Sequence, residues 1–271
     1  ADKPWQFLAW CFEWAEYCRN GKLNTFLPVS MDATNNGLQI LSLLMRDEHG
    51  AKSTNVLPTV IPEDIYGDIA DKVKEYLQED NTEMSRKWLD FGIDRSTLKR
   101  SVMVMPYGGT FYSCRAYIDE WYQDKIRKKK LINPFSENDR YRCTGYLAQL
   151  SWRAIHEVLK KPTECMNWLK ACASAVAREG KPIEWVTPSG FPVKQSYFGF
   201  SNQEVKTNIS GKATYVSFRK ENDKVSVKKN KQGISPNFVH SVDATLLTKA
   251  VIAANSEAEV WDFSMIHDSM G

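Results

Sequence analysis

Apolar side chains recur every three to four residues along most of this chain, which is the spacing of helices with one buried face. The spacing predicts helices over residues 4–20, 38–46, 62–80, 94–105, 108–128, 143–160, 163–178 and 235–254. Residues 25–32 and 259–267 instead alternate apolar and polar side chains, and residues 183–232 do so around turn-forming residues. These three segments predict strands and hairpins. The pattern therefore predicts an α+β fold that is mostly helical.

Local signals refine the predicted helices. Acidic residues early and lysines late in residues 62–80 match the helix dipole. Pro106 removes a backbone donor and crowds the preceding turn, so it should kink or end the helix over residues 94–105. Ser235 followed by Pro236 is typical of a helix start, with serine as the capping residue and proline at the first position.

Composition places the chain among globular proteins. Its 271 residues are 42% hydrophobic and include nine tryptophans and twelve phenylalanines, which supply a core and exclude a disordered chain. The length allows one large domain or two moderate ones. No run reaches the roughly 18–20 apolar residues of a membrane span, and the first residues lack the pattern of a secretory signal.

The charge of the chain is mildly basic and unevenly distributed. The net charge is +3, with basic runs at residues 125–130 and 224–231. Such runs are more often solvated faces than nucleic-acid sites, so charge alone favours the simpler interpretation. The six cysteines form no CxxC pair and have no histidine at metal-ligand spacing, which indicates reduced thiols and a cytosol-like compartment.

Two aspartates stand at the ends of predicted strands. Asp32 ends the strand over residues 25–32, and Asp268 follows the strand over residues 259–267. Each alone is typical of a surface turn. If the two strands share a sheet, neighbouring carboxylates would repel each other unless divalent cations lay between them, and Mg²⁺ prefers such oxygen ligands. Two ions about 4 Å apart would hold the attacking and leaving oxygens of a phosphoryl transfer.

The stretch DRSTLKRSVMVMPYGG carries positive charge on a predicted helix. Arg95 and Lys99 are four residues apart and share one helix face, where an arginine fork and a lysine charge suit a polyphosphate. An isolated pair of this kind is usually a solvated basic face. The longer spacing R-x3-K-x7-Y-G is rarer, and it puts the Tyr107 ring beside a flexible Gly-Gly, where it can stack on a base or contact a sugar.

These stretches, in this order, resemble the single-subunit DNA-directed RNA polymerases of bacteriophages and mitochondria. The resemblance covers nearly the whole chain and rests on the segments FLAWCFEWA, PVSMDATNNGLQILSLLMRDEHG, NVLP, DIYGDIADKV, RSTLKRSVMVMPYGG, CMNWLK, EWVTPSGFPV, GISPNFVHSVDATLL and IHDSMG. It implies a right-hand polymerase, with a palm that has a small antiparallel sheet and with helical fingers. Residues 1–60 and 235–271 would form the palm, residues 61–182 the fingers, and residues 183–234 an insertion like the family's promoter-reading hairpin.

The resemblance implies metal-binding and triphosphate-binding roles for individual residues. Asp32 and Asp268, assisted by the backbone carbonyl of Ala33, would bind two Mg²⁺ ions. The incoming triphosphate would be held by three side chains of the helix over residues 94–105, namely Arg95, Lys99 and Arg100. Lys99 would also neutralise charge during catalysis and is a candidate proton donor to the pyrophosphate.

The resemblance also implies contacts to the rest of the nucleotide and to the primer. Tyr107 would stack at the insertion site, and its hydroxyl would recognise the ribose together with His240. Gly37 matches a position where a small residue leaves room for the 2′-hydroxyl. His267 would lie beside the primer end.

The expected function is nucleotidyl transfer: synthesis of RNA from nucleoside triphosphates, directed by a DNA template and promoter, by a monomer. The expected compartment is the host cytoplasm for a phage-encoded chain, ahead of a mitochondrial or plastid matrix. Two alternatives stay open. A family A DNA polymerase shares the R-x3-K-x7-Y-G helix but fills the Gly37 region with a bulky acidic residue, and a nucleic-acid-binding remnant would lack catalysis. Both chain ends look cut, so the resemblance implies a palm-and-fingers fragment without the family's thumb and N-terminal domain.

Overall fold

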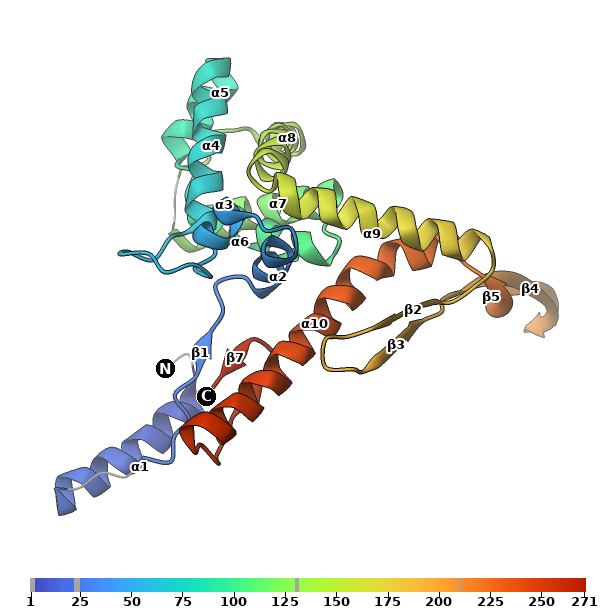
Figure 1. Cartoon of the computed structure of the whole chain (residues 1–271). Coiled ribbons are helices and arrows are strands. Elements are labelled where there is room, and N and C mark those ends of the chain that lie inside the picture. Colours follow the sequence, from blue (N-terminus) through green and yellow to red (C-terminus); the bar gives the residue numbers. More distant parts are fainter. Residues whose placement is uncertain (1–2, 22–24, 130–131, 210) are drawn as a thin grey trace. The chain divides into compact units, whose positions relative to one another are not determined.

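The computed structural model describes residues 3–21, 25–129, 132–209 and 211–271 (Figure 1). The chain divides into two compact units, residues 1–33 with 246–271 and residues 34–245. Most described residues are helical and the strands form small antiparallel sheets, which confirms the predicted α+β, mostly helical class. The boundaries predicted between palm, fingers and insertion stay predictions.

The unit of residues 34–245 contains a helical body. Its helices are α2 (Asn36–Leu44), α3 (Glu48–Ser53), α4 (Ile65–Asp80), α5 (Glu83–Phe91), α6 (Arg95–Val104), α7 (Phe111–Lys129), α8 (Arg140–Val158) and α9 (Lys160–Arg178). Two 3-10 turns, η1 (Met105–Tyr107) and η2 (Glu137–Asp139), lie between them. Every helix predicted between residues 38 and 178 is present, and the structure adds α3 and α5, which the spacing analysis did not predict.

Apolar side chains from these helices form the core of this unit. Fully buried members include Trp88 of α5, Leu98 of α6, Ile118 of α7 and Leu147 of α8. Several of these helices start where a short polar side chain accepts a hydrogen bond from a backbone N–H group that the helix leaves unpaired. Capping side chains of this kind are Asn35 for α2, Asp64 for α4, Thr82 for α5 and Asp94 for α6.

α6 ends close to Pro106, as predicted. The α-helical part stops at Val104, and residues 105–107 continue as η1. The cause is that Pro106 has no N–H to donate to the carbonyl group four residues earlier. Tyr107 is therefore placed by a 3-10 turn and not by the α-helix itself.

Two antiparallel hairpins follow α9. β2 (Ile183–Val186) pairs with β3 (Pro192–Gln195), and the longer β4 (Phe198–Ile209) pairs with β5 (Lys212–Val225). Nearly all described side chains of the β4–β5 ribbon are exposed, so the ribbon adds little to the core. The hairpins confirm the predicted strand-rich segment except at its end, where the chain has become helical by Val227.

The long helix α10 (Val227–Ala258) contradicts the predicted helix start at Ser235. Ser235 is buried inside α10, and its hydroxyl donates to the backbone carbonyl of Pro106 at 2.8 Å. Pro236 also lies within the helix, where proline normally costs about 3 kcal/mol. The packing of buried neighbours such as Ile234 and Val239 outweighs this local signal, which is why the sequence pattern was misleading here.

The unit of residues 1–33 and 246–271 contains α1 (Pro4–Asn20), which confirms the predicted first helix. Its sheet has the order β1 (Met31–Asp32), β7 (Ser269–Met270) and β6 (Met265–Ile266), and all pairs are antiparallel. The strands predicted over residues 25–32 and 259–267 are therefore wrong in length, because each contributes only two residues to the sheet. Alternation marks where a strand can form, but a strand extends only where a partner receives its backbone hydrogen bonds.

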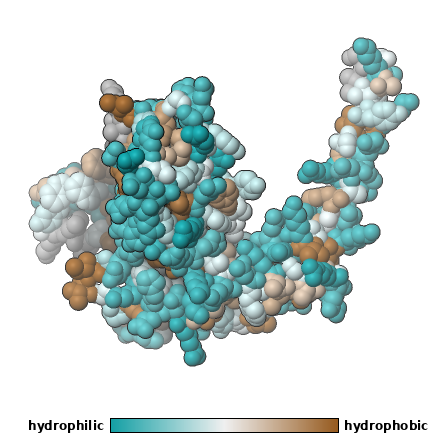
Figure 2. Space-filling model, turned by 90° about the horizontal axis from the view of Figure 1, so that it is seen from above, coloured by the Kyte–Doolittle hydropathy of each residue, from teal (hydrophilic) through white to brown (hydrophobic). Residues whose placement is uncertain are grey.

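In the parts of the chain that the structure describes, no helix combines the length and the apolar character needed to cross a membrane. The face drawn in Figure 2 is mostly hydrophilic, and its apolar residues lie in small separate patches.

Candidate active site

The two aspartates predicted to bind metal belong to adjacent hydrogen-bonded segments of one sheet. Asp32, the last residue of β1, pairs with Ser269 of β7. The backbone N–H of Ala33 donates to the backbone carbonyl of Asp268 at 3.2 Å. Asp268 lies in the two-residue turn between β6 and β7, after His267, whose φ of 54° is in the left-handed region. The pairing of β1 with β7 thus brings together two acidic residues from opposite ends of the sequence.

The oxygen donors of this sheet suit Mg²⁺ chemically. Two carboxylates and the backbone carbonyl of Ala33 are hard ligands, and Mg²⁺ usually completes its shell with water and substrate phosphate oxygens. Across the described ranges, no group of three or more histidine, cysteine, aspartate or glutamate side chains could hold a metal ion. Metal binding at Asp32 and Asp268 would therefore draw on substrate and water oxygens as well.

The three basic side chains of α6 differ in the contacts that they make. Arg95 donates from Nε to both carboxylate oxygens of Asp64, at 3.1 and 2.9 Å. Lys99, one turn later, is exposed and makes no hydrogen bond or ion pair within the described residues. Arg100 forms an ion pair with Glu120 of α7. Arg95 and Lys99 therefore share one side of α6, as predicted, whereas Arg100 is turned toward α7.

Tyr107 contacts two other residues of the predicted nucleotide site. Its ring stacks on the ring of His240 of α10, with centroids 4.8 Å apart and planes inclined by 15°. A Cβ placed on Gly37 of α2 would lie 3.2 Å from Cζ of Tyr107 and 2.7 Å from Cβ of Pro106. The structure thus brings Gly37, Tyr107 and His240 together, and position 37 has no room for a side chain unless its neighbours move.

Three basic side chains of the run over residues 125–130 form ion pairs with nearby acids. Lys125 binds Asp94 at 2.7 Å, and both Arg127 and Lys128 pair with Asp124. Lys130, the last residue of the run, lies outside the described residues. The described part of this run therefore favours the interpretation of a solvated, ion-paired face over a nucleic-acid site.

Comparison with known proteins decides which family these residues belong to. A family profile for DNA-dependent RNA polymerase matches residues 1–271, the full length of the chain. The chain belongs to the DNA-dependent RNA polymerase family. The resemblance stated from the sequence motifs is thereby confirmed.

Relatives of this RNA polymerase chain come from phages and organelles. It is 33% identical to the T7 RNA polymerase of Escherichia phage T7, over 100% of this chain and 35% of the phage protein. It is 31% identical to the DNA-directed RNA polymerase of Enterobacteria phage T3, with the same coverage of 100% and 35%. The mitochondrial DNA-directed RNA polymerase of Mus musculus is 32% identical, over 99% of this chain and 22% of that protein. The chain therefore spans about a third of the length of the phage relatives.

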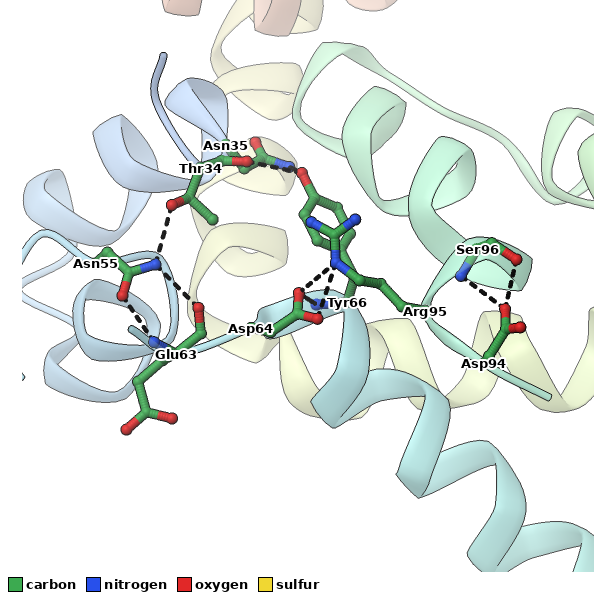
Figure 3. Close-up of polar contacts among 9 residues, drawn as sticks. All are labelled: Thr34, Asn35, Asn55, Glu63, Asp64, Tyr66, Asp94, Arg95 and Ser96. Carbon is green, nitrogen blue, oxygen red and sulfur yellow. Dashed lines mark hydrogen bonds and ion pairs between the residues drawn. The ribbon is translucent and has the colours of Figure 1, made fainter. Parts of the chain in front are cut away.

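This RNA polymerase chain carries a group of side chains at the start of α4 that the sequence analysis missed (Figure 3). Asp64 accepts from the backbone N–H of Tyr66 at 3.2 Å, which caps α4, and it also binds Arg95. The guanidinium carbon of Arg95 lies 4.7 Å from the centroid of the Tyr66 ring. The Tyr66 hydroxyl donates to the backbone carbonyl of Thr34 at 2.8 Å and accepts from the Asn35 amide at 3.4 Å. Tyr66 is only 2% exposed, so these bonds lie away from bulk water.

Asn55 connects the segment that leads into Asp64 with Thr34. Its amide nitrogen donates to Thr34 Oγ1 at 3.0 Å and to the backbone carbonyl of Glu63 at 2.9 Å. Its amide oxygen accepts from the Glu63 N–H at 2.8 Å. Asn55 has a φ of 61°, in the left-handed region that asparagine tolerates. The only sequence signal for this network was the acidic start of the predicted helix over residues 62–80, which the helix dipole explains without naming a partner.

Proposed function

We propose that this chain supplies catalytic residues for DNA-directed RNA synthesis from nucleoside triphosphates. The relatives with that activity in their names are about three times longer, so the activity is carried over to this chain as a proposal. The observation that supports it most strongly is the pairing of β1 with β7, which joins the segments of Asp32 and Asp268. Mg²⁺ ions held there by the two carboxylates and the Ala33 carbonyl would lower the pKa of an RNA 3′-hydroxyl and offset charge at phosphorus.

Basic side chains of α6 bind the triphosphate in this proposal. Arg95 offers a planar fork of N–H donors, which matches phosphate oxygens, and Lys99 offers an exposed point charge. Lys99 also neutralises charge that develops on the leaving pyrophosphate and donates a proton to it. Arg100 is included as a further triphosphate contact, which would require it to leave Glu120.

The sugar and the primer end are assigned to a second set of residues. Tyr107 and His240 contact the ribose, and the stacking of their rings supports a shared role. Gly37 is assigned the role of leaving space for the 2′-hydroxyl, and a larger residue at this position would also require Pro106 and Tyr107 to move. His267 lies next to Asp268 in sequence and is assigned to the primer end.

The β4–β5 ribbon is the proposed contact to promoter DNA. Its exposed basic side chains are Lys206, Lys212, Arg219, Lys220 and Lys224. Such side chains bind phosphates first and so position a protein on DNA without reading bases. The partners of this proposal are a DNA template with its promoter, nascent RNA and nucleoside triphosphates. The protein acts as a monomer, in the host cytoplasm if a phage encodes it.

The two alternative functions considered from the sequence receive different support. The relatives are RNA polymerases, so a family A DNA polymerase has no further support. A binding remnant without catalysis would need neither the Asp32–Asp268 pair nor an exposed Lys99, and the presence of all three favours a catalytic role.

Extension of a primed RNA–DNA hybrid with nucleoside triphosphates and Mg²⁺ tests the proposal. We expect Asp32→Asn and Asp268→Asn each to abolish extension by the chain, and equal extension by all three proteins would remove the two-metal mechanism. Binding of Mn²⁺, measured from the relaxation rate of water protons, tests the same site without requiring enzymatic turnover. Each substitution should weaken Mn²⁺ binding tenfold or more, roughly, since it removes a direct ligand. Unchanged Mn²⁺ binding in both variants would contradict the site.

A further inference from the structure

The Arg95 side chain is held in a way that leaves part of its guanidinium group available. Both hydrogen bonds to Asp64 come from Nε, on the side edge of the guanidinium fork. Within the described residues, the terminal Nη atoms of Arg95 take part in no hydrogen bond. An arginine fork binds phosphate with two parallel N–H groups, and the two Nη atoms provide such a pair. The contact with Asp64 therefore fixes the side chain without using its outer edge.

The Tyr66 ring provides a second constraint on Arg95. The guanidinium carbon lies 4.7 Å from the ring centroid, within the range of a cation–π contact. The ring is itself fixed, because it is buried and its hydroxyl donates to the Thr34 carbonyl. Figure 3 shows Asp64 and Tyr66, both from the start of α4, next to the Arg95 side chain. Arg95, which belongs to α6, is thus oriented by residues at the start of α4.

The segment before α4 is held in place by Asn55. Its three hydrogen bonds join Glu63, the residue before Asp64, to Thr34, whose backbone carbonyl also receives the Tyr66 hydroxyl. Asp64 is further fixed as the cap of α4. The carboxylate that binds Arg95 is therefore part of a connected network and not a mobile surface acid.

We propose that Asp64 and Tyr66 are positioning residues that preorganise Arg95 to bind the triphosphate with its Nη edge. The inference rests on the proposed function and assigns to that site two residues which the sequence analysis did not. Arg95 is 49% and Asp64 41% exposed, so their ion pair by itself adds little stability. Its effect is on binding: ordering a long side chain on binding weakens affinity by roughly two- to tenfold, and a side chain that is already ordered avoids this loss.

Two simpler roles for Asp64 make different predictions. As a helix cap only, Asp64 could be replaced by asparagine without loss, because both residues cap helices well. As a competitor for Arg95, Asp64 would weaken triphosphate binding, and its removal would strengthen it. The substitution Asp64→Asn keeps the cap and removes the carboxylate charge, so it separates all three roles.

Asp94 offers a matched control. It caps α6, as Asp64 caps α4, and its side chain binds Ser96 and Lys125. Asp94→Asn makes the same change in charge one residue from Arg95 in sequence. It should leave the affinity for a triphosphate nearly unchanged if the effect of Asp64 comes from its contact with Arg95 and not from charge in general.

Binding of Mg·ATP to the chain, measured by isothermal titration calorimetry, tests the proposal. We expect Asp64→Asn to weaken binding about two- to tenfold, with little change for AMP, which lacks the outer phosphates. In the Arg95→Ala background, Asp64→Asn should cause no further loss, because alanine leaves no cationic side chain for Asp64 to hold. In the unbound chain, the Nε–Hε signal of Arg95 in a ¹H–¹⁵N spectrum should be visible and should broaden or disappear in Asp64→Asn.

The possible outcomes separate the inference from the proposed function. Tighter or unchanged Mg·ATP binding by Asp64→Asn, while Arg95→Ala weakens it, would overturn the inference alone. The same loss from Asp64→Asn in both Arg95 backgrounds would also overturn it, because the effect would not pass through Arg95. Absence of Mg·ATP binding by the unaltered chain would overturn the assigned nucleotide site and, with it, the inference.

Discussion

Gly37→Ala should destabilise the chain even though alanine favours helices more than glycine does. Atoms of carbon in contact normally lie about 3.5–4.0 Å apart. The added methyl group would lie 2.7 Å from Cβ of Pro106 and 3.0 Å from its Cγ, so these atoms must separate by about 1 Å. Pro106 is buried and its backbone carbonyl is bonded to Ser235, which limits how far it can move.

The net magnitude follows from two opposing effects. Overpacking of this kind costs about 1–3 kcal/mol, and the change from glycine to alanine in a helix returns about 0.5–1 kcal/mol. We expect the free energy of unfolding to fall by about 1 kcal/mol, within a range of about 0–2.5 kcal/mol. Gly145→Ala in α8 is the control, since a Cβ there would meet only the end of the Arg115 side chain, at 3.4 Å or more. That substitution should raise the free energy of unfolding by about 0.5 kcal/mol or more.

Urea unfolding of the three proteins, followed by tryptophan fluorescence, measures both effects. The two alanine substitutions should shift the midpoint in opposite directions with similar slopes. A stabilising effect of Gly37→Ala would show that Pro106 and Tyr107 yield without strain, and the crowding argument for position 37 would then be wrong. In Mg·ATP titrations, a destabilised but folded Gly37→Ala protein should also bind more weakly, because the clash displaces Tyr107.

Three further predictions concern stability. Partial burial works to raise the pKa of Asp94, but bonds from Lys125 and Ser96 outweigh it and lower the pKa to about 2. The stability that Asp94 contributes, about 1 kcal/mol after allowance for exposure, is therefore complete above about pH 4 and is lost as the pH falls toward 2. The urea midpoints of the unaltered chain and Asp94→Asn should accordingly converge over that range, and a constant difference would contradict this. Asn55→Ala should lower the free energy of unfolding by about 2 kcal/mol, because the variant loses three hydrogen bonds and places alanine at a left-handed φ. Asn55→Gly should avoid the strain at that φ but still lose the hydrogen bonds, so thermal unfolding should show an intermediate stability. Replacement of residues 199–224 by a short turn should change the free energy of unfolding of the helical body by less than about 0.5 kcal/mol, because those of the removed residues that the structure describes are nearly all exposed. A larger loss in urea unfolding would contradict this.

The sequence predicted those helices and helix ends that depend on residues close together in the chain. Helices α1 to α9, apart from the short α3 and α5, follow from apolar spacing, and the end of α6 follows from the missing N–H of Pro106. The start of α10 was predicted wrongly, because a proline in a helix is tolerated when distant residues pack around it. Ser235 shows this, since its partner Pro106 is far away in sequence.

For the candidate site, the sequence likewise predicted some features and not others. Residue types and spacing identified Asp32, Asp268, Arg95 and Lys99, and the structure joins the two acidic segments in one sheet. The directions of the side chains could not be predicted from the sequence, because they depend on partners from other helices. Arg100 turns to Glu120 on α7, and Arg95 to Asp64 at the start of α4.

The proline at position 106 limits the movements available to Tyr107. The N–H of Met105 already donates to the Val102 carbonyl, and Pro106 has no N–H to add, so a further α-helical turn of α6 would lack one backbone hydrogen bond and crowd the proline ring. The chain beyond the ring is Gly108, at a φ of 91°, followed by a second glycine. If the nucleotide-addition cycle repositions Tyr107, rotation about this Gly-Gly pair would avoid that cost, whereas a screw displacement that extends α6 would incur it.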